Sequence, residues 1–194
     1  MEKTLRAFIA VGLSPEVRRW LAEARSELEE RIPSRCVRWT DADGIHITLK
    51  FLGDIPESSL GTIRSVMDGA ARGCRPFSLS VEGLGCFPDV ARPRVVWAGV
   101  QRHASFWDLQ KRLEDGLAGA GFPKERRDFS PHLTLARVRD GVAGGKLAEI
   151  GRAVTHATNR PPVGMPVPGY GLYRSVLRPT GAEYSLLYRT TLEG

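Results

Sequence analysis

Two short stretches of the sequence, HITL at residues 46–49 and HLTL at residues 132–135, share one pattern and lie in different halves of the chain. The first belongs to a strict alternation of apolar and polar residues, Ile45 to Phe51, and the second to a similar run, Pro131 to Val138. Such alternation predicts β-strands. Because successive side chains of a strand point to opposite faces of its sheet, the histidine and threonine of each stretch should share one face.

Each strand is therefore expected to present one imidazole and one hydroxyl, about 6.6–7 Å apart along the strand. The pairs are His46 with Thr48, and His132 with Thr134. The residues expected to face a core are Ile45, Ile47, Leu49 and Phe51 in the first strand and Leu133 and Leu135 in the second.

The recurrence of His-x-Thr exceeds chance, because composition alone predicts about 0.2 matches in a chain of this kind. A third match, at residues 156–158, runs into Asn159-Arg160-Pro161-Pro162 and lacks apolar alternation. Prolines exclude a central strand there, so we interpret this copy as accidental. A single half-buried histidine beside a threonine is usually a packed, hydrogen-bonded pair, whereas two copies in matching strands favour a shared function.

The rest of the chain reads as strands alternating with helices and joined by hairpin-like turns, which predicts an α+β or mixed α/β fold. Ser14 and Pro15 form an N-cap signal for the first helix. Helices are expected at residues 15–31, 60–70, 106–117 and 147–154, and further strands at residues 5–13, 36–40, 77–81, 94–100, 171–177 and 183–190. Residues 159–169, with four prolines, are expected to form a loop. No linker divides the chain, so we expect a single domain over residues 1–194.

Composition is that of an ordinary globular protein, with 42% hydrophobic and 26% charged residues among 194. No apolar run approaches the roughly 18 residues of a membrane span, and we recognise no signal peptide. The three cysteines are odd in number and lack CxxC spacing. This argues against a disulfide framework or a cysteine zinc site and favours the cytoplasm.

The net charge of +6 favours an anionic partner. Most of the 28 basic residues are arginine. Arginine suits bidentate phosphate contacts, and codon bias in a GC-rich genome explains the same excess equally well.

Two histidines on facing strands suit acid–base chemistry on a phosphodiester. Since the ordinary pKa of histidine is near 6.5, one ring can accept a proton while the other donates one. Threonine hydroxyls can hold the non-bridging phosphate oxygens. The sequence has no HExxH motif, GxSxG elbow or Walker loop, which disfavours the enzyme classes built on them, and we expect neither metal nor cofactor.

The motif blocks at residues 46–53 and 129–137 resemble those of the 2H phosphoesterase superfamily. With the segments at residues 6–10, 37–39, 92–97 and 172–175, the chain is most similar to the RNA 2′,3′-cyclic phosphodiesterase family, also called 2′–5′ RNA ligase. This resemblance implies an α+β bilobal fold, with two pseudo-symmetric lobes of antiparallel sheet backed by helices and both motifs lining a central cleft. One departure is the Pro/Gly-rich segment Pro161 to Gly169, at the expected cleft edge.

The resemblance also implies a role for each motif residue. His46 would donate a proton to the leaving oxygen, His132 would accept one from water, and Thr48 and Thr134 would hold the phosphate. Arg137 matches a basic substrate-binding position, yet strict alternation puts it on the face of Leu133. It would reach the phosphate only if the strand twists or ends there.

The implied reaction opens an RNA-terminal 2′,3′-cyclic phosphate to a 2′-phosphomonoester, and 2′–5′ ligation would run the reverse type of reaction. The expected partner is RNA with a cyclic-phosphate end, bound by a monomer that does not associate with membranes. Two alternatives remain: a non-catalytic binder of RNA ends, and a phosphodiesterase for small cyclic nucleotides or 2′–5′ oligonucleotides.

Overall fold

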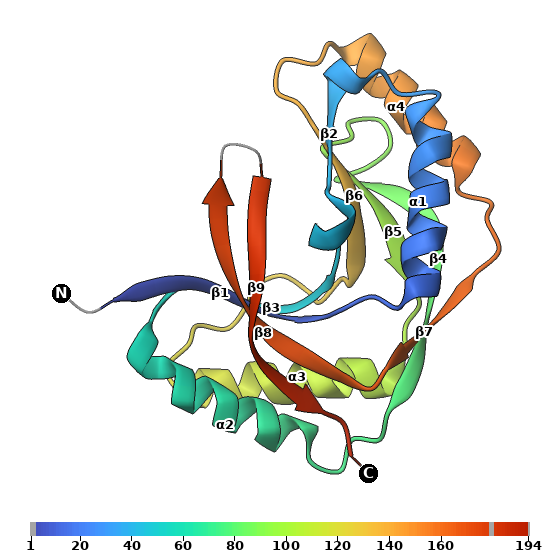
Figure 1. Cartoon of the computed structure of the whole chain (residues 1–194). Helices are drawn as coiled ribbons and strands as arrows, with labels where there is room; N and C mark the ends of the chain where they lie inside the picture. Colours follow the sequence, from blue (N-terminus) through green and yellow to red (C-terminus); the bar gives the residue numbers. More distant parts are fainter. Residues whose placement is uncertain (1–2, 179–180, 194) are drawn as a thin grey trace.

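The computed structural model describes residues 3–178 and 181–193, and its strands form two separate antiparallel sheets (Figure 1). The first sheet has four strands in the order β3-β1-β8-β9. Their bounds are Thr4–Val11 for β1, Ile47–Pro56 for β3, Gly169–Arg178 for β8 and Gly181–Thr191 for β9. The second sheet has five strands in the order β2-β6-β5-β4-β7. Their bounds are Val37–Trp39 for β2, Phe77–Phe87 for β4, Val95–Val100 for β5, His132–Val138 for β6 and Val163–Val167 for β7.

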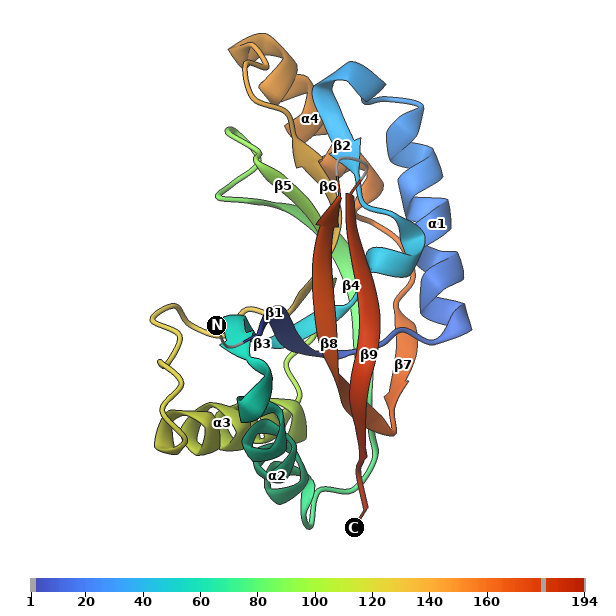
Figure 2. The same ribbon diagram turned by 60° about the vertical axis from the view of Figure 1, so that its left-hand side comes forward.

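Two helices cover each sheet. Helices α2 (Leu60–Ala71) and α3 (Ala104–Gly119) pack on the first sheet, and α1 (Pro15–Glu29) and α4 (Gly144–Ala157) pack on the second (Figures 1 and 2). The expected α+β fold with two lobes of antiparallel sheet backed by helices is therefore confirmed. Within the described ranges, none of these helices combines the length and apolarity needed to cross a membrane.

The lobes are not successive halves of the sequence. Strand β1 belongs to the first sheet while α1, which follows it directly, covers the second. Strands β8 and β9 then return the end of the chain to the first sheet, where β8 pairs with β1. Each lobe nevertheless carries one motif strand, β3 or β6.

Helix α1 shows how closely local signals determine an element. Ser14 is its N-cap and accepts a hydrogen bond from the Val17 amide, and proline occupies the first helical position. The apolar residues that recur at helical spacing, Val17, Leu21, Ala24 and Leu28, are all buried.

The structure differs from the sequence prediction in one missed strand and in the bounds of several elements, among them β3, which runs Ile47–Pro56 where a strand over residues 45–51 was expected. The expected loop at residues 159–169 contains strand β7, which pairs with β4 at the end of the second sheet. Proline is tolerated in an edge strand because one side of that strand makes no ladder bonds, so Pro166 does not break it. Strand β4 extends six residues beyond the predicted Val81, to Phe87, and α4 is longer than predicted at both ends.

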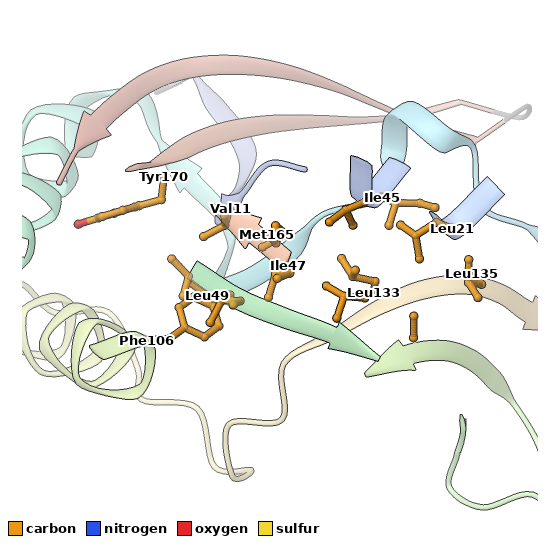
Figure 3. Close-up of a cluster of buried hydrophobic side chains, with 14 of the residues drawn as sticks. Val11, Leu21, Ile45, Ile47, Leu49, Phe106, Leu133, Leu135, Met165 and Tyr170 are labelled. Atoms are coloured by element: carbon orange, nitrogen blue, oxygen red, sulfur yellow. The ribbon is translucent and has the colours of Figure 1, made fainter. Parts of the chain in front are cut away.

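The apolar residues of both motif strands meet in one core cluster (Figure 3). Ile47 and Leu49 come from β3, and Leu133 and Leu135 from β6; each is at most 3% exposed. Burial of these side chains contributes roughly 1.5–3 kcal/mol each. Their packing fixes the orientation of the two strands and thereby of the polar side chains between them.

Candidate active site

A pocket of about 340 Å³ is lined by side chains of both lobes. Strand β3 and the residue before it contribute Thr48 and His46, and strand β6 contributes His132, Thr134 and Arg137. The β8–β9 hairpin forms a further wall. All five residues singled out from the sequence thus line one pocket.

Both histidines are held in the same way. The Nδ1 atom of His46 lies 2.9 Å from the Gly44 carbonyl oxygen, and Nδ1 of His132 lies 2.8 Å from the Ser130 carbonyl oxygen. A carbonyl oxygen can only accept, so each Nδ1 carries the proton and donates. The Nε2 atom of each ring is therefore the atom left to exchange protons with a substrate.

The surroundings of the two rings differ. His46 stacks on Phe8, with ring centroids 4.5 Å apart, and meets the ring of Tyr184 edge-on at 5.2 Å. Burial lowers the pKa of His46, and the hydrogen bond to the Gly44 carbonyl opposes this effect. His132 meets the ring of Phe87 edge-on, with centroids 4.9 Å apart.

Each motif strand contains a β-bulge at the fourth motif residue. On β3, Thr48 pairs with Ala10 and Lys50 with Ile9, so Leu49 is the extra residue. A bulge inserts one residue into the pleat, and the side chains beyond it change faces. Phe51 consequently lines the pocket and is 48% exposed, whereas Lys50 is buried. The prediction that Phe51 faces the core was wrong for this reason.

Strand β6 contains the same kind of bulge. Thr134 pairs with Trp97 and Ala136 with Val96, so Leu135 is the extra residue. Beyond this bulge Ala136 is buried and Arg137 lines the pocket. Strict alternation put Arg137 on the face of Leu133, and the bulge corrects that assignment.

Lys50 makes a buried ion pair. Its Nζ atom lies 2.6 Å from Oε1 of Glu114 on α3 and donates a second hydrogen bond of 2.6 Å to the Pro123 carbonyl. The Glu114 carboxylate also accepts from the Glu125 amide at 2.6 Å. A buried charge requires such partners to offset its lost hydration. The pair ties β3 to α3 and to the loop that precedes β6.

The sequence matches the family described as LigT like Phosphoesterase over residues 11–97 and 103–184. The chain belongs to this family.

Similar proteins include the "RNA 2′,3′-cyclic phosphodiesterase" of Methanothermobacter thermautotrophicus, 36% identical over 93% of this chain and 95% of that protein. The protein of that name from Thermotoga maritima is 30% identical over 98% and 97%. Among solved structures, TT0787 of Thermus thermophilus has a TM-score of 0.78 at 31% identity, covering 98% of this chain and 99% of its own. Escherichia coli LigT in complex with 3′-AMP has a TM-score of 0.75 at 26% identity, covering 99% and 100%.

Several pocket residues of this phosphoesterase were not predicted from its sequence. They come from strands distant in sequence: Arg6 and Phe8 on β1, and Leu177 and Tyr184 on β8 and β9. The Arg6 guanidinium lies 4.8 Å from the ring centroid of Phe51. Nothing in the local pattern of β1 marks these residues, because their position depends on how the first sheet pairs.

The other sequence features lie outside the pocket. His156, in the third His-x-Thr match, is exposed on helix α4. His103 precedes α3 and stacks on Phe77. The atypical segment at residues 161–169 includes β7, the edge strand of the second sheet, and none of its residues lines the pocket. Among residues 3–178 and 181–193, no three histidine, cysteine, aspartate or glutamate side chains are grouped as metal ligands.

Proposed function

We propose that this phosphoesterase opens an RNA-terminal 2′,3′-cyclic phosphate to a 2′-phosphomonoester by two-histidine acid–base catalysis that needs no metal. The observation that carries the proposal is the repeated arrangement of the two motifs, with each Nδ1 bonded to a carbonyl and both rings lining one pocket with two threonines. The names of similar proteins at 30–36% identity support the choice of substrate.

In the proposed reaction, His132 Nε2 accepts a proton from water as the water oxygen attacks phosphorus. The P–O3′ bond breaks, and His46 Nε2 donates its proton to the leaving O3′. General acid–base catalysis of this kind contributes roughly 10²–10⁴ in rate. Joining a second RNA through its 5′-hydroxyl, in place of water, gives a 2′–5′ linkage by the same steps.

Thr48, Thr134 and Arg137 would hold the phosphate. Hydroxyl donors stabilise the charge that develops on non-bridging oxygens, and a guanidinium can donate two parallel hydrogen bonds to them. Over the described residues, no carboxylate lies within ion-pair distance of Arg137. Its charge is thus free to meet an anion.

The lowered pKa of His46 bears directly on its role as donor. In the free protein, burial favours the neutral ring, whereas donation requires the imidazolium. The negative phosphate of a bound substrate favours the imidazolium, so substrate binding itself would charge the donor. We further propose that the protein acts as a cytoplasmic monomer; its three cysteines are all free thiols, as a reducing compartment favours.

The test is to incubate the purified protein and EDTA with a short RNA ending in 2′,3′-cyclic phosphate and to resolve the product isomers. We expect turnover to the 2′-phosphate at the same rate with and without the chelator. Tight binding without turnover would instead indicate a non-catalytic binder of RNA ends. A 3′-phosphate product, or activity that disappears with EDTA and returns with Zn²⁺ or Mn²⁺, would overturn the proposed reaction.

A further inference from the structure

A second groove, of about 310 Å³, adjoins the pocket at His132. Phe129, Ser130 and His132 line both cavities, so the groove continues the pocket past the second histidine. None of the residues of the first motif lines this groove. It therefore extends the site on one side only, the side of the proposed proton acceptor.

The walls of the groove are aromatic. Trp107 packs against Phe129 with ring centroids 5.2 Å apart, and Phe87 packs against Trp97 at the same distance. The indole of Trp97 lies against Gly85, where any side chain would collide with it. The rings are thus set in place by the folded chain, and they offer the apolar surfaces on which nucleobases stack.

The side chain of Arg102 places a positive charge beside these rings. Arg102 is exposed, and its guanidinium lies 5.4 Å from the Trp107 ring centroid. Across residues 3–178 and 181–193 it has no carboxylate within ion-pair distance. Aromatic faces next to an unpaired cation are the combination that binds single-stranded nucleic acid through base and backbone together.

The direction of the proposed reaction indicates which nucleoside would occupy the groove. The attacking oxygen loses its proton to His132 and therefore approaches phosphorus from the side of that ring. In hydrolysis the attacking oxygen belongs to water. In ligation it is a 5′-hydroxyl: the new O5′–P bond forms, the P–O3′ bond breaks, His132 takes the hydroxyl proton and His46 protonates O3′.

We propose that the groove lined by Trp107 and Arg102 binds the nucleoside attached to O5′, the second RNA end of a 2′–5′ phosphodiester. This proposal rests on the proposed function, because it uses the same two histidines. A cyclic mononucleotide would leave the groove empty, whereas a 2′–5′ dinucleotide would fill it.

The test compares two substrates, adenosine 2′,3′-cyclic phosphate and the 2′–5′-linked dinucleotide of adenosine, for each of four variants. Trp107→Ala and Arg102→Ala should each lower kcat/KM for cleavage of the dinucleotide by about ten- to a hundredfold relative to hydrolysis of the cyclic nucleotide. Trp107→Phe keeps an aromatic face and should retain most of the kcat/KM for the dinucleotide relative to that for the cyclic nucleotide. Arg64→Ala is the matched control, since this guanidinium lies over Tyr188 and neither residue lines the groove.

The outcomes separate this proposal from the one on which it rests. If the unaltered protein opened neither the cyclic mononucleotide nor an RNA-terminal 2′,3′-cyclic phosphate, the proposed function itself would be overturned. Normal hydrolysis with no cleavage of the dinucleotide would overturn the groove assignment alone. Equal losses on both substrates in Trp107→Ala and Arg102→Ala, or no loss on either, would do the same.

Discussion

The two motif strands, β3 and β6, are alike in backbone and differ in character at two side chains beyond the motif. Each places a histidine whose Nδ1 donates to the carbonyl two residues earlier, then a threonine in the pocket, then a bulge. The first residue beyond the bulge is Lys50 on β3 and Ala136 on β6, and both are buried. The next residue, facing the pocket, is Phe51 on β3 and Arg137 on β6.

The comparison distinguishes the pocket side chains that both lobes supply from those that only one lobe supplies. The shared part is the position of an imidazole and a hydroxyl, which is what proton transfer on a phosphate requires. The added part is asymmetric: one strand presents an aromatic ring to the pocket and the other a cation.

The largest effect is expected from removing either imidazole. His46→Ala and His132→Ala should each lower kcat for opening of the cyclic phosphate by about 10²–10⁴, because each removes one proton transfer. The control is His156→Ala, on exposed α4, which should be near neutral. Turnover close to that of the unaltered protein in either motif variant would end the two-histidine mechanism.

The next effect concerns stability and distinguishes Lys50 from its counterpart Ala136. Glu114→Ala should lower the free energy of unfolding by about 3–5 kcal/mol, because it leaves the buried Lys50 ammonium without its carboxylate. Asp115→Ala, at the neighbouring position, removes an exposed carboxylate and should have a much smaller effect. Denaturant unfolding measures the stability of both variants. Equal decreases in the free energy of unfolding would show that the buried Lys50–Glu114 pair stabilises the fold no more than the exposed ion pairs of Asp115 do.

A smaller effect is expected at the paired positions Phe51 and Arg137. Arg137→Ala should lower kcat/KM by roughly ten- to a hundredfold, the range expected for losing hydrogen bonds to a charged group. Phe51→Ala removes no charge and should cost less than about fivefold by the same reasoning. The two variants are compared on one cyclic-phosphate substrate. Comparable losses would contradict the assignment of phosphate binding to β6.

The smallest effect follows from the buried His46 ring. Its pKa is lowered in the folded state, so just below the ordinary value near 6.5 the unfolded chain binds a proton that the folded chain does not. The free energy of unfolding should therefore fall as pH drops through this window. His46→Gln should reduce its slope against pH by an amount equivalent to at most one bound proton. Chemical denaturation between pH 7 and 5 measures this slope. An unchanged slope, with His156→Gln as the control, would show that His46 is not the cause.

The sequence alone predicted the features that depend on local pattern. Alternation identified both motif strands and the faces of His46, Thr48, His132 and Thr134, and the cap signal at Ser14 located α1. Prediction from sequence failed where the pairing between strands decides which face a side chain occupies. The bulges at Leu49 and Leu135 exist only in relation to β1 and β5, so the positions of Phe51 and Arg137 could not be predicted from alternation. Strand β7 was missed because a proline such as Pro166 is acceptable within a strand mainly at a sheet edge.

In the proposed reaction the two motif imidazoles divide the proton transfers, His46 as donor and His132 as acceptor. The most direct test measures His46→Ala and His132→Ala on a nitrophenyl phosphodiester beside the cyclic-phosphate substrate. A nitrophenolate leaves with little need of a proton, so this substrate should restore the rate of His46→Ala much more than that of His132→Ala. Equal restoration of both variants, or restoration of His132→Ala alone, would contradict the division of roles.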